Sequence, residues 1–153
     1  MVVAAGNQGS GERTIAKPGD DPWVITVGAT DDHGTVSIAD DTVAEFSSRG
    51  PTLADGIAKP DVAAPGRSLH SLRSPGSEAD LRYPYFVDGT HRLGSGTSFS
   101  APEVAGAAAL LHQADPAASN NRVTRASRSC VCVVPEEGFR MTTIILGATG
   151  PPL

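Results

Sequence analysis

The chain has 153 residues, of which 39% are hydrophobic and 5% aromatic, and its formal net charge is -5. This length allows one domain with a moderate core, and the acidic balance argues against nucleic-acid binding. No apolar stretch is long enough to span a membrane, and residues 1–5 lack the basic start and the length of a signal peptide. Because the chain opens directly on an apolar run, we interpret Met1 as an internal methionine or a misassigned start.

Two apolar runs near the beginning of the chain predict buried strands. They are residues 2–5 and residues 23–29, and the second is rich in β-branched side chains. Asn7 follows the first run directly after Gly6. An asparagine beside a glycine is most often a turn residue. Here it would lie at the carboxyl end of a strand, where ligands bind in open parallel sheets, so its amide is a candidate hydrogen-bond donor.

The later part of the chain changes from a polar loop to a helix. Residues 67–92 are poor in apolar side chains outside 83–87 and predict a loop leading into a short strand or hairpin. Residues 97–113 predict a helix whose faces are all apolar or small, and we expect it to be buried nearly all round against a sheet. Pro116 and the polar run after it end the pattern.

The start of that helix carries the most informative motif, Gly96-Thr97-Ser98. A serine is a poor nucleophile unless a base takes its proton and donors receive the charge on the attacked carbonyl oxygen. The unpaired N–H groups of a helix N-terminus can supply one donor, and Gly96 would let the backbone approach closely. The alternative is a simple helix cap, since Ser100 and Glu103 have the spacing of a capping box.

Four segments of the chain resemble, in the same order, segments of the subtilases, the subtilisin-like serine proteases. A motif gains weight when its expected context is present, and the resemblance covers about residues 2–115. It implies an α/β fold with a mainly parallel sheet and flanking helices. The four segments are Val2 to Asn7, Phe46 to Pro51, Lys59 to Gly66 and Gly96 to Gly106.

The resemblance also implies the roles of the site residues. Ser98 would be the nucleophile, and Asn7 together with the Ser98 N–H would form the oxyanion hole. Lys17 falls at the base of the pocket for the side chain preceding the cleaved bond, where better-known members carry an aromatic residue, so the cleavage preference stays open. A plain turn role for Lys17 is equally open. The remaining residues expected to bind substrate are Ala4, Ala5, Gly6, Gly19, Gly96 and Thr97.

Subtilases order their catalytic groups as Asp, His, Asn and Ser, and this chain begins just before the Asn. We therefore expect the Asp and His segments upstream of Met1, which makes the catalytic domain incomplete at its N-terminal side. His33-Gly34-Thr35 looks like the family's His-Gly-Thr motif, but it follows Asn7 and no apolar helical run follows it. We interpret it as a chance match, and His70, His91 and His112 have no motif support.

Two functions remain open from the sequence. The first is a serine endopeptidase fragment that acts on peptides or proteins, is extracellular by resemblance, and is inactive alone because its triad is incomplete. The second is a non-catalytic peptide-binding or interaction module derived from a subtilase. No metal ligand is assigned, calcium is an expectation from the resemblance only, and the oligomeric state is not predicted. The upstream genomic sequence would discriminate between the two functions.

The end of the chain departs from the family pattern. We place the partial catalytic domain at residues 1–121 and a divergent tail at 122–153, and the net charge changes from -7 to +2 between them. Cys130 and Cys132 are too sparse for a structural zinc site and badly spaced for a mutual disulfide. A reading-frame change after about Val123, which we favour, and ordinary divergence with a terminal hairpin are both open. We assign no function to this tail.

Overall fold

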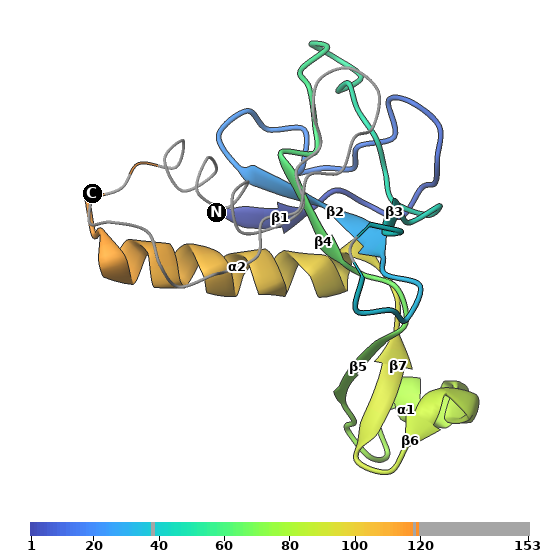
Figure 1. Ribbon diagram of the computed structural model, residues 1–153. Helices are drawn as coiled ribbons and strands as arrows, with labels where there is room; N and C mark the ends of the chain where they lie inside the picture. The colour runs from blue at the N-terminus through green and yellow to red at the C-terminus, as the bar shows by residue number, and fades with distance from the viewer. Residues whose placement is uncertain (38, 118, 120–153) are drawn as a thin grey trace.

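The structure is a computed structural model that describes residues 1–37, 39–117 and 119. The predicted tail, residues 122–153, lies outside the described residues. In chain order the elements are β1 (Val2–Ala4), β2 (Ile25–Asp31), β3 (Thr42–Val43), β4 (Val62–Pro65), β5 (Leu69–Leu72), α1 (Glu78–Arg82), the 3-10 helix η1 (Pro84–Phe86), β6 (Val87–Asp88), β7 (His91–Gly94) and α2 (Thr97–Ala114). Figure 1 shows the first four strands lying on α2, and β5 to β7 forming a separate small lobe beyond the start of that helix.

The larger sheet is built around β2. Val27 of β2 pairs with Ala4 of β1 and with Val62 of β4, and both pairings are parallel, so β1 and β4 lie on opposite edges of β2. The short strand β3 pairs antiparallel with the end of β2. Parallel strands need cover on both faces, which explains why six of the seven β2 residues are buried. The mainly parallel sheet expected from the sequence is present.

The core lies between this sheet and one face of α2. Ile25 and Val27 of β2 form a buried cluster with Val104 and Ala108 of the helix, joined by side chains of β4. The small helix residues let the helix axis approach the sheet closely. The other face of the sheet is covered by a loop in which Ser47 is 1% exposed and accepts a hydrogen bond from the Ala29 N–H at 3.0 Å.

The second predicted strand is displaced along the chain. It begins at Ile25 instead of Trp23 and continues past Ala29 to Asp31. The Asp21 carboxylate accepts a hydrogen bond from the Trp23 N–H at 2.7 Å, and this local turn holds the Trp23 side chain outside, 79% exposed. An aspartate that bonds the backbone two residues on favours a turn over a strand.

The prediction that the long helix is buried nearly all round is wrong. Its extent, 97–114, is close to the predicted 97–113, but its buried residues are Thr97, Ser100, Val104 and Ala108, along one face. Leu110 on the opposite side is 67% exposed. Within the described part of the chain the larger sheet packs against one face of α2, and Phe99 at its start lies against Gly94 of β7. The apolar pattern on every face of the helix therefore did not produce burial on every face.

The lobe contains more structure than the predicted loop and hairpin. The hairpin of β6 and β7 is present, and β5 adds a third antiparallel strand by pairing with β7. Helix α1 begins at Glu78 and is capped by Ser77, whose hydroxyl accepts a hydrogen bond from the Asp80 N–H. Exposed polar strands have little hydrophobic alternation, so no sequence pattern predicts β5. No helix among the described residues is both long and apolar enough to cross a membrane.

Candidate active site

The turn after β1 is joined to the start of α2 through Asn7 and Thr97. The Thr97 backbone N–H donates to Asn7 Oδ1 at 2.9 Å, and the Thr97 hydroxyl donates to the same oxygen at 3.0 Å. The Thr97 hydroxyl oxygen in turn accepts from the Gly6 N–H at 3.2 Å. Because the atom that accepts two hydrogen bonds must be the carbonyl oxygen, these bonds distinguish Oδ1 from Nδ2 in the Asn7 carboxamide. Asn7 Nδ2 is therefore the outward donor, and it has no partner among the described residues.

Gly96, which precedes the helix, allows the Asn7 side chain to lie close to the backbone at the start of α2. Its φ is +150°, a conformation that L side chains rarely adopt. A Cβ at this position would lie 3.1 Å from Asn7 Nδ2 and would crowd the amide. The Gly96 N–H donates to the Gly66 carbonyl at 2.8 Å, so the end of β4 also holds the turn.

The capping-box interpretation of Ser100 is wrong. The helix begins at Thr97, and Ser100 lies within it, fully buried. Its hydroxyl donates to the Pro65 carbonyl at 2.9 Å. A Cβ on Gly66 would overlap Ser100 Oγ and the Ala29 methyl group. The serine thus fastens the helix to β4 at a point where only glycine leaves enough room.

Ser98 is the second residue of α2 and is exposed. Neither its N–H nor its hydroxyl makes a hydrogen bond with another described residue, whereas the next N–H, that of Phe99, is satisfied by the Gly96 carbonyl at 2.9 Å. The N-terminus of a helix carries partial positive charge. An exposed hydroxyl, a free backbone N–H and the Asn7 amide donor therefore meet at this end of α2. Such an arrangement can receive an oxygen atom that gains negative charge.

No histidine of the chain contacts Ser98 within the described residues. His33 is exposed at the end of β2, with Nε2 3.1 Å from Thr42 Oγ1 and Nδ1 3.8 Å from an Asp31 carboxylate oxygen. His70 and His91 lie on β5 and β7 of the lobe. His112 is fourteen residues further along α2 than Ser98, which at 1.5 Å per residue is about 21 Å away. If Ser98 is the nucleophile, as the resemblance implies, its general base is not among these contacts.

The structure brings together the two segments expected to wall the substrate pocket. The Ala16 N–H donates to the Ala5 carbonyl at 2.8 Å, and a Cβ on Gly19 would touch the Ala4 carbonyl at 3.2 Å. Ala5 and Gly19 are themselves buried, while Ala4 and Gly6 are half-buried. The end of β1 and residues 16–19 therefore lie side by side, as the resemblance implies.

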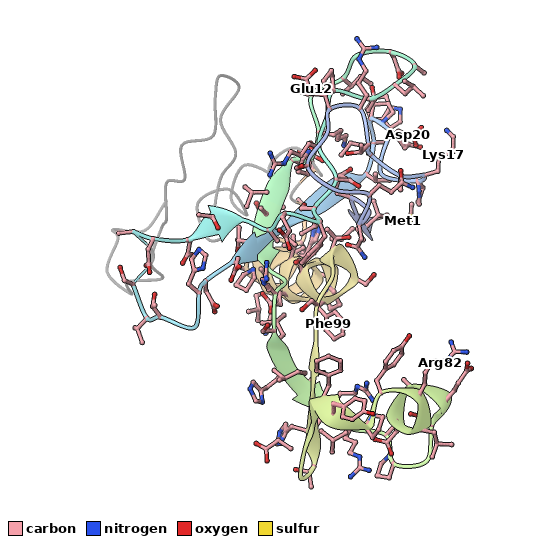
Figure 2. The ribbon with its side chains drawn as sticks, turned by 90° about the vertical axis from the view of Figure 1, so that its right-hand side faces the viewer. Met1, Glu12, Lys17, Asp20, Arg82 and Phe99 are labelled. Carbon is pink, nitrogen blue, oxygen red and sulfur yellow. The ribbon has the colours of Figure 1, made fainter. Side chains whose placement is uncertain are left out.

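Thr97, expected to bind substrate, and Lys17, for which a pocket role and a turn role are both open, make contacts within the chain. Thr97 is 1% exposed, and its polar atoms are engaged with Asn7 and Gly6, so it positions the amide donor. Lys17 is 87% exposed and pairs with Asp20 at 2.6 Å, beside a separate pocket of about 370 Å³. Figure 2 shows Lys17 and Asp20 on the outer loops, well apart from Phe99 at the start of α2.

Sequence reasoning missed the contacts that hold this site, because they join distant parts of the chain. The Thr97 and Asn7 side chains are 90 residues apart, and Ser100 and Pro65 are 35 apart. The available signal was the order of the four motif segments, which contain all of these residues. That order indicated a shared site but not which atoms bond.

The family model of the subtilases matches residues 1–129. The chain belongs to the subtilase family. Serine protease AprX of Bacillus subtilis is 52% identical to it over 117 residues, which cover 76% of this chain and 26% of AprX. A subtilisin of Bacillus sp. (strain TA39) is 34% identical over 128 residues, covering 78% of this chain and 26% of that protein.

Solved structures give the same family fold. Sphericase has a TM-score of 0.61 and 28% identity, covering 84% of this subtilase chain and 39% of its own. A psychrophilic protease has a TM-score of 0.59 and 31% identity. The predicted α/β, subtilisin-like fold is confirmed. The chain spans about a quarter of the two Bacillus relatives, and the family match extends eight residues beyond the predicted boundary at 121.

Proposed function

We propose that this chain carries the nucleophile and the oxyanion-binding part of a serine endopeptidase site. Ser98 attacks the carbonyl carbon of a peptide bond, while Asn7 Nδ2 and the Ser98 N–H receive the oxygen. The observation that carries this proposal is the double hydrogen bond from Thr97 to Asn7 Oδ1, which leaves the amide nitrogen free beside the start of α2. Donors held in place before the reaction need no reorganisation when charge develops.

We further propose that the chain is the C-terminal part of a catalytic domain. The base and the carboxylate that orients it would then come from polypeptide outside this chain, and the chain alone would be inactive. Loss of the histidine in a subtilisin lowers kcat about 2 × 10⁶-fold. The lack of any hydrogen bond from a described histidine to Ser98 supports this part of the proposal.

The substrates that this function implies are peptides or proteins, and the location is extracellular. The second point is supported by similarity to the Minor extracellular protease Vpr of Bacillus subtilis, 42% identical over 74 residues. Calcium is implied by the family resemblance only, and we assign no residues to it: within residues 1–37, 39–117 and 119 no group of three or more carboxylate, histidine or cysteine side chains could hold a metal ion. No step of the proposed chemistry passes through a metal.

The test compares the chain with a protein extended upstream to include the expected Asp and His segments. A fluorophosphonate probe should label the extended protein and leave the chain unlabelled. Ser98→Ala should abolish the labelling, and Ser10→Ala, a change in an exposed loop, should not. A folded extended protein that fails to label would contradict the nucleophile assignment. Labelling of the chain alone that is lost in Ser98→Ala would contradict its proposed inactivity.

The alternative function is a non-catalytic peptide-binding or interaction module. The observation that favours it is that the exposed Ser98 hydroxyl has no hydrogen-bond partner among the described residues. Under this alternative the Asn7 and Ser98 donors would bind a peptide carbonyl without cleaving it. Peptide binding by the extended protein with no hydrolysis and no labelling would favour the module.

A further inference from the structure

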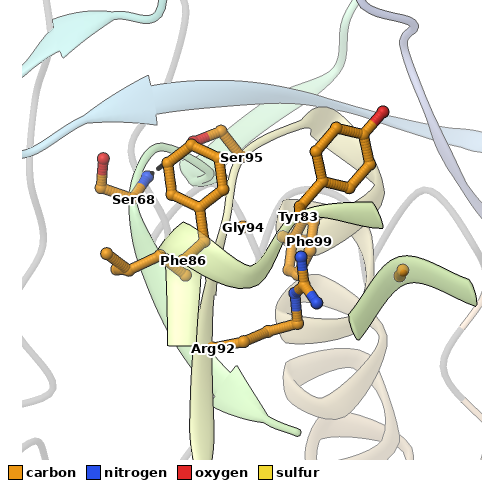
Figure 3. Close-up of a pocket in the computed structure, with 9 residues that line it drawn as sticks. Ser68, Tyr83, Phe86, Arg92, Gly94, Ser95 and Phe99 are labelled. Atoms are coloured by element: carbon orange, nitrogen blue, oxygen red, sulfur yellow. Dashed lines mark hydrogen bonds between the residues drawn. The ribbon is translucent and has the colours of Figure 1, made fainter. Parts of the chain in front are cut away.

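A pocket of about 480 Å³ lies between the lobe and the start of α2 (Figure 3). Its volume falls within the range of pockets that bind small ligands or single side chains. Aromatic rings, one arginine and backbone of β7 form its walls. The lining residues are Ser68, Ala79, Tyr83, Phe86, Arg92, Leu93, Gly94, Ser95 and Phe99.

The pocket lies on the far side of Ser98 from the Asn7 amide. Thr97, which holds Asn7, and Phe99, which lines the pocket, are two residues apart in α2, so their side chains point about 200° apart around the helix. The Phe99 ring packs on Gly94, where it leaves no room for a Cβ. A peptide bound across Ser98 would thus have one flank at the β1 side and the other at this pocket.

Aromatic surface is unusually exposed around the pocket. Tyr83 is 48% and Phe86 is 50% exposed, and both belong to the segment at η1. Exposed apolar surface of this kind at the rim of a pocket commonly marks a binding site. The Ser68 N–H donates to Ser95 Oγ at 2.9 Å, which ties the lobe to the residue just before the nucleophile turn.

Arg92 supplies the polar group of the pocket. Its Nη1 atom is buried and has no hydrogen-bond partner among the described residues. The nearby Asp80 carboxylate does not accept a hydrogen bond from Arg92. Its two oxygens instead accept from Arg73 at 2.6 and 2.9 Å and from the Gly76 N–H at 3.0 Å. Figure 3 shows the Arg92 side chain extending from β7 toward Phe99 and Tyr83. A buried guanidinium N–H without an acceptor is costly.

We propose that this pocket binds a glutamate side chain of the peptide substrate, on the flank of the cleaved bond away from the Asn7 side. The apolar stem of the glutamate would pack between the aromatic rings, and a small rotation of the Arg92 side chain would bring its free N–H to the carboxylate. Charge-assisted hydrogen bonds of this kind are about twice as strong as neutral ones. That the glutamate belongs to a substrate rests on the proposed function, whereas its recognition by Arg92 does not.

The experiment measures binding without catalysis. The full chain carrying Ser98→Ala is titrated against fluorescent peptides amidated at the C-terminus, identical except for a single Glu or Gln, and anisotropy is recorded. The Glu peptide should bind about tenfold tighter or more. Arg92→Met should remove the difference, and Arg92→Lys should keep part of it. Arg82→Met is the matched control, since this arginine of the same lobe is 65% exposed and faces Glu78 at 3.5 Å.

Equal or undetectable binding of both peptides would overturn the proposal, and so would a preference for Glu that survives Arg92→Met. Tighter binding of the Gln peptide when its C-terminus is a free carboxylate would also overturn it, because the pocket would then recognise a chain terminus and not a glutamate side chain. Circular dichroism of each variant shows whether α1 and the strands remain folded. Arg92→Lys separates loss of the charge from loss of the fold. Hydrolysis by the extended protein without a Glu preference would overturn the pocket assignment alone, and a Glu preference without hydrolysis would overturn the proposed function alone.

Discussion

Thr97 donates two hydrogen bonds to the single carboxamide oxygen of Asn7, one from its backbone N–H at 2.9 Å and one from its hydroxyl at 3.0 Å. Helix α2 and the turn after β1 are thereby held in one orientation. Thr97 is buried, so it acts on the site by orienting the Asn7 side chain. Substitutions at these two residues should therefore have different signatures.

Thr97→Val should weaken both the fold and the alignment of Asn7. The change removes the hydroxyl bond and leaves the Gly6 N–H without its acceptor, which we expect to lower the free energy of unfolding by about 1–3 kcal/mol. Urea denaturation of the chain measures this. Thr97→Ser, which keeps the hydroxyl, should stay close to the parent. A Val variant as stable as the Ser variant would show that the hydroxyl bonds contribute nothing.

Asn7→Ala should act on catalysis. In the upstream-extended protein we expect kcat to fall about 10²- to 10³-fold, the loss that follows removal of the equivalent kind of donor in a subtilisin. His33→Ala should leave kcat nearly unchanged, because His33 bonds Thr42 at the edge of the sheet. Steady-state hydrolysis of a chromogenic peptide measures both. A folded but inactive His33→Ala protein would overturn the placement of the base outside this chain.

Lys59→Met should destabilise the chain strongly. The Lys59 side chain is 2% exposed, and Nζ donates to Asp61 Oδ2 at 2.7 Å and to the Val24 carbonyl at 2.8 Å. Removing one member of a fully buried ion pair costs about 3–5 kcal/mol, and we expect a loss below that range because the Asp61 side chain is 18% exposed. Lys17→Met is the matched control, since the Lys17 pair with Asp20 is on the surface, and it should cause no measurable change. Similar unfolding curves for the two variants would contradict this assignment of the buried pair.

Acid should loosen the lobe through Asp80. Hydrogen bonds from Arg73, and after them from the Gly76 N–H, lower the pKa of Asp80 from 3.8 to about 2. A lowered pKa in the folded state means that the stabilisation is fully present above pH 3.8 and is lost as the pH falls toward 2. Asp80→Asn should remove this part of the pH dependence. The measurement is the difference in urea midpoint between the two proteins from pH 5 to pH 2, and a constant difference would refute it.

The sequence predicted the parts of the molecule that short motifs specify. The four ordered segments indicated the subtilase fold, and the apolar period of residues 97–113 located α2 to within one residue. It failed where distant groups decide the structure. The Asp21 turn shortened β2 at its start, and β5 of the lobe was missed because this strand is short and polar. The partners of Thr97 and Ser100, and the missing partner of Arg92, depend on packing that no local pattern encodes.

The exposed face of α2 provides the last prediction. Leu110 is 67% exposed, whereas its neighbour Leu111 packs against the core cluster of Ile25 and Val104. Leu110→Lys should therefore keep the free energy of unfolding nearly unchanged while reducing self-association and the binding of an apolar dye. Leu111→Lys should destabilise, because it places a charge against the core. Chemical denaturation and dye fluorescence of the two variants measure both effects. If Leu110→Lys destabilises the chain as much as Leu111→Lys does, then this face of α2 is covered in solution, and the one-sided burial of the helix is wrong.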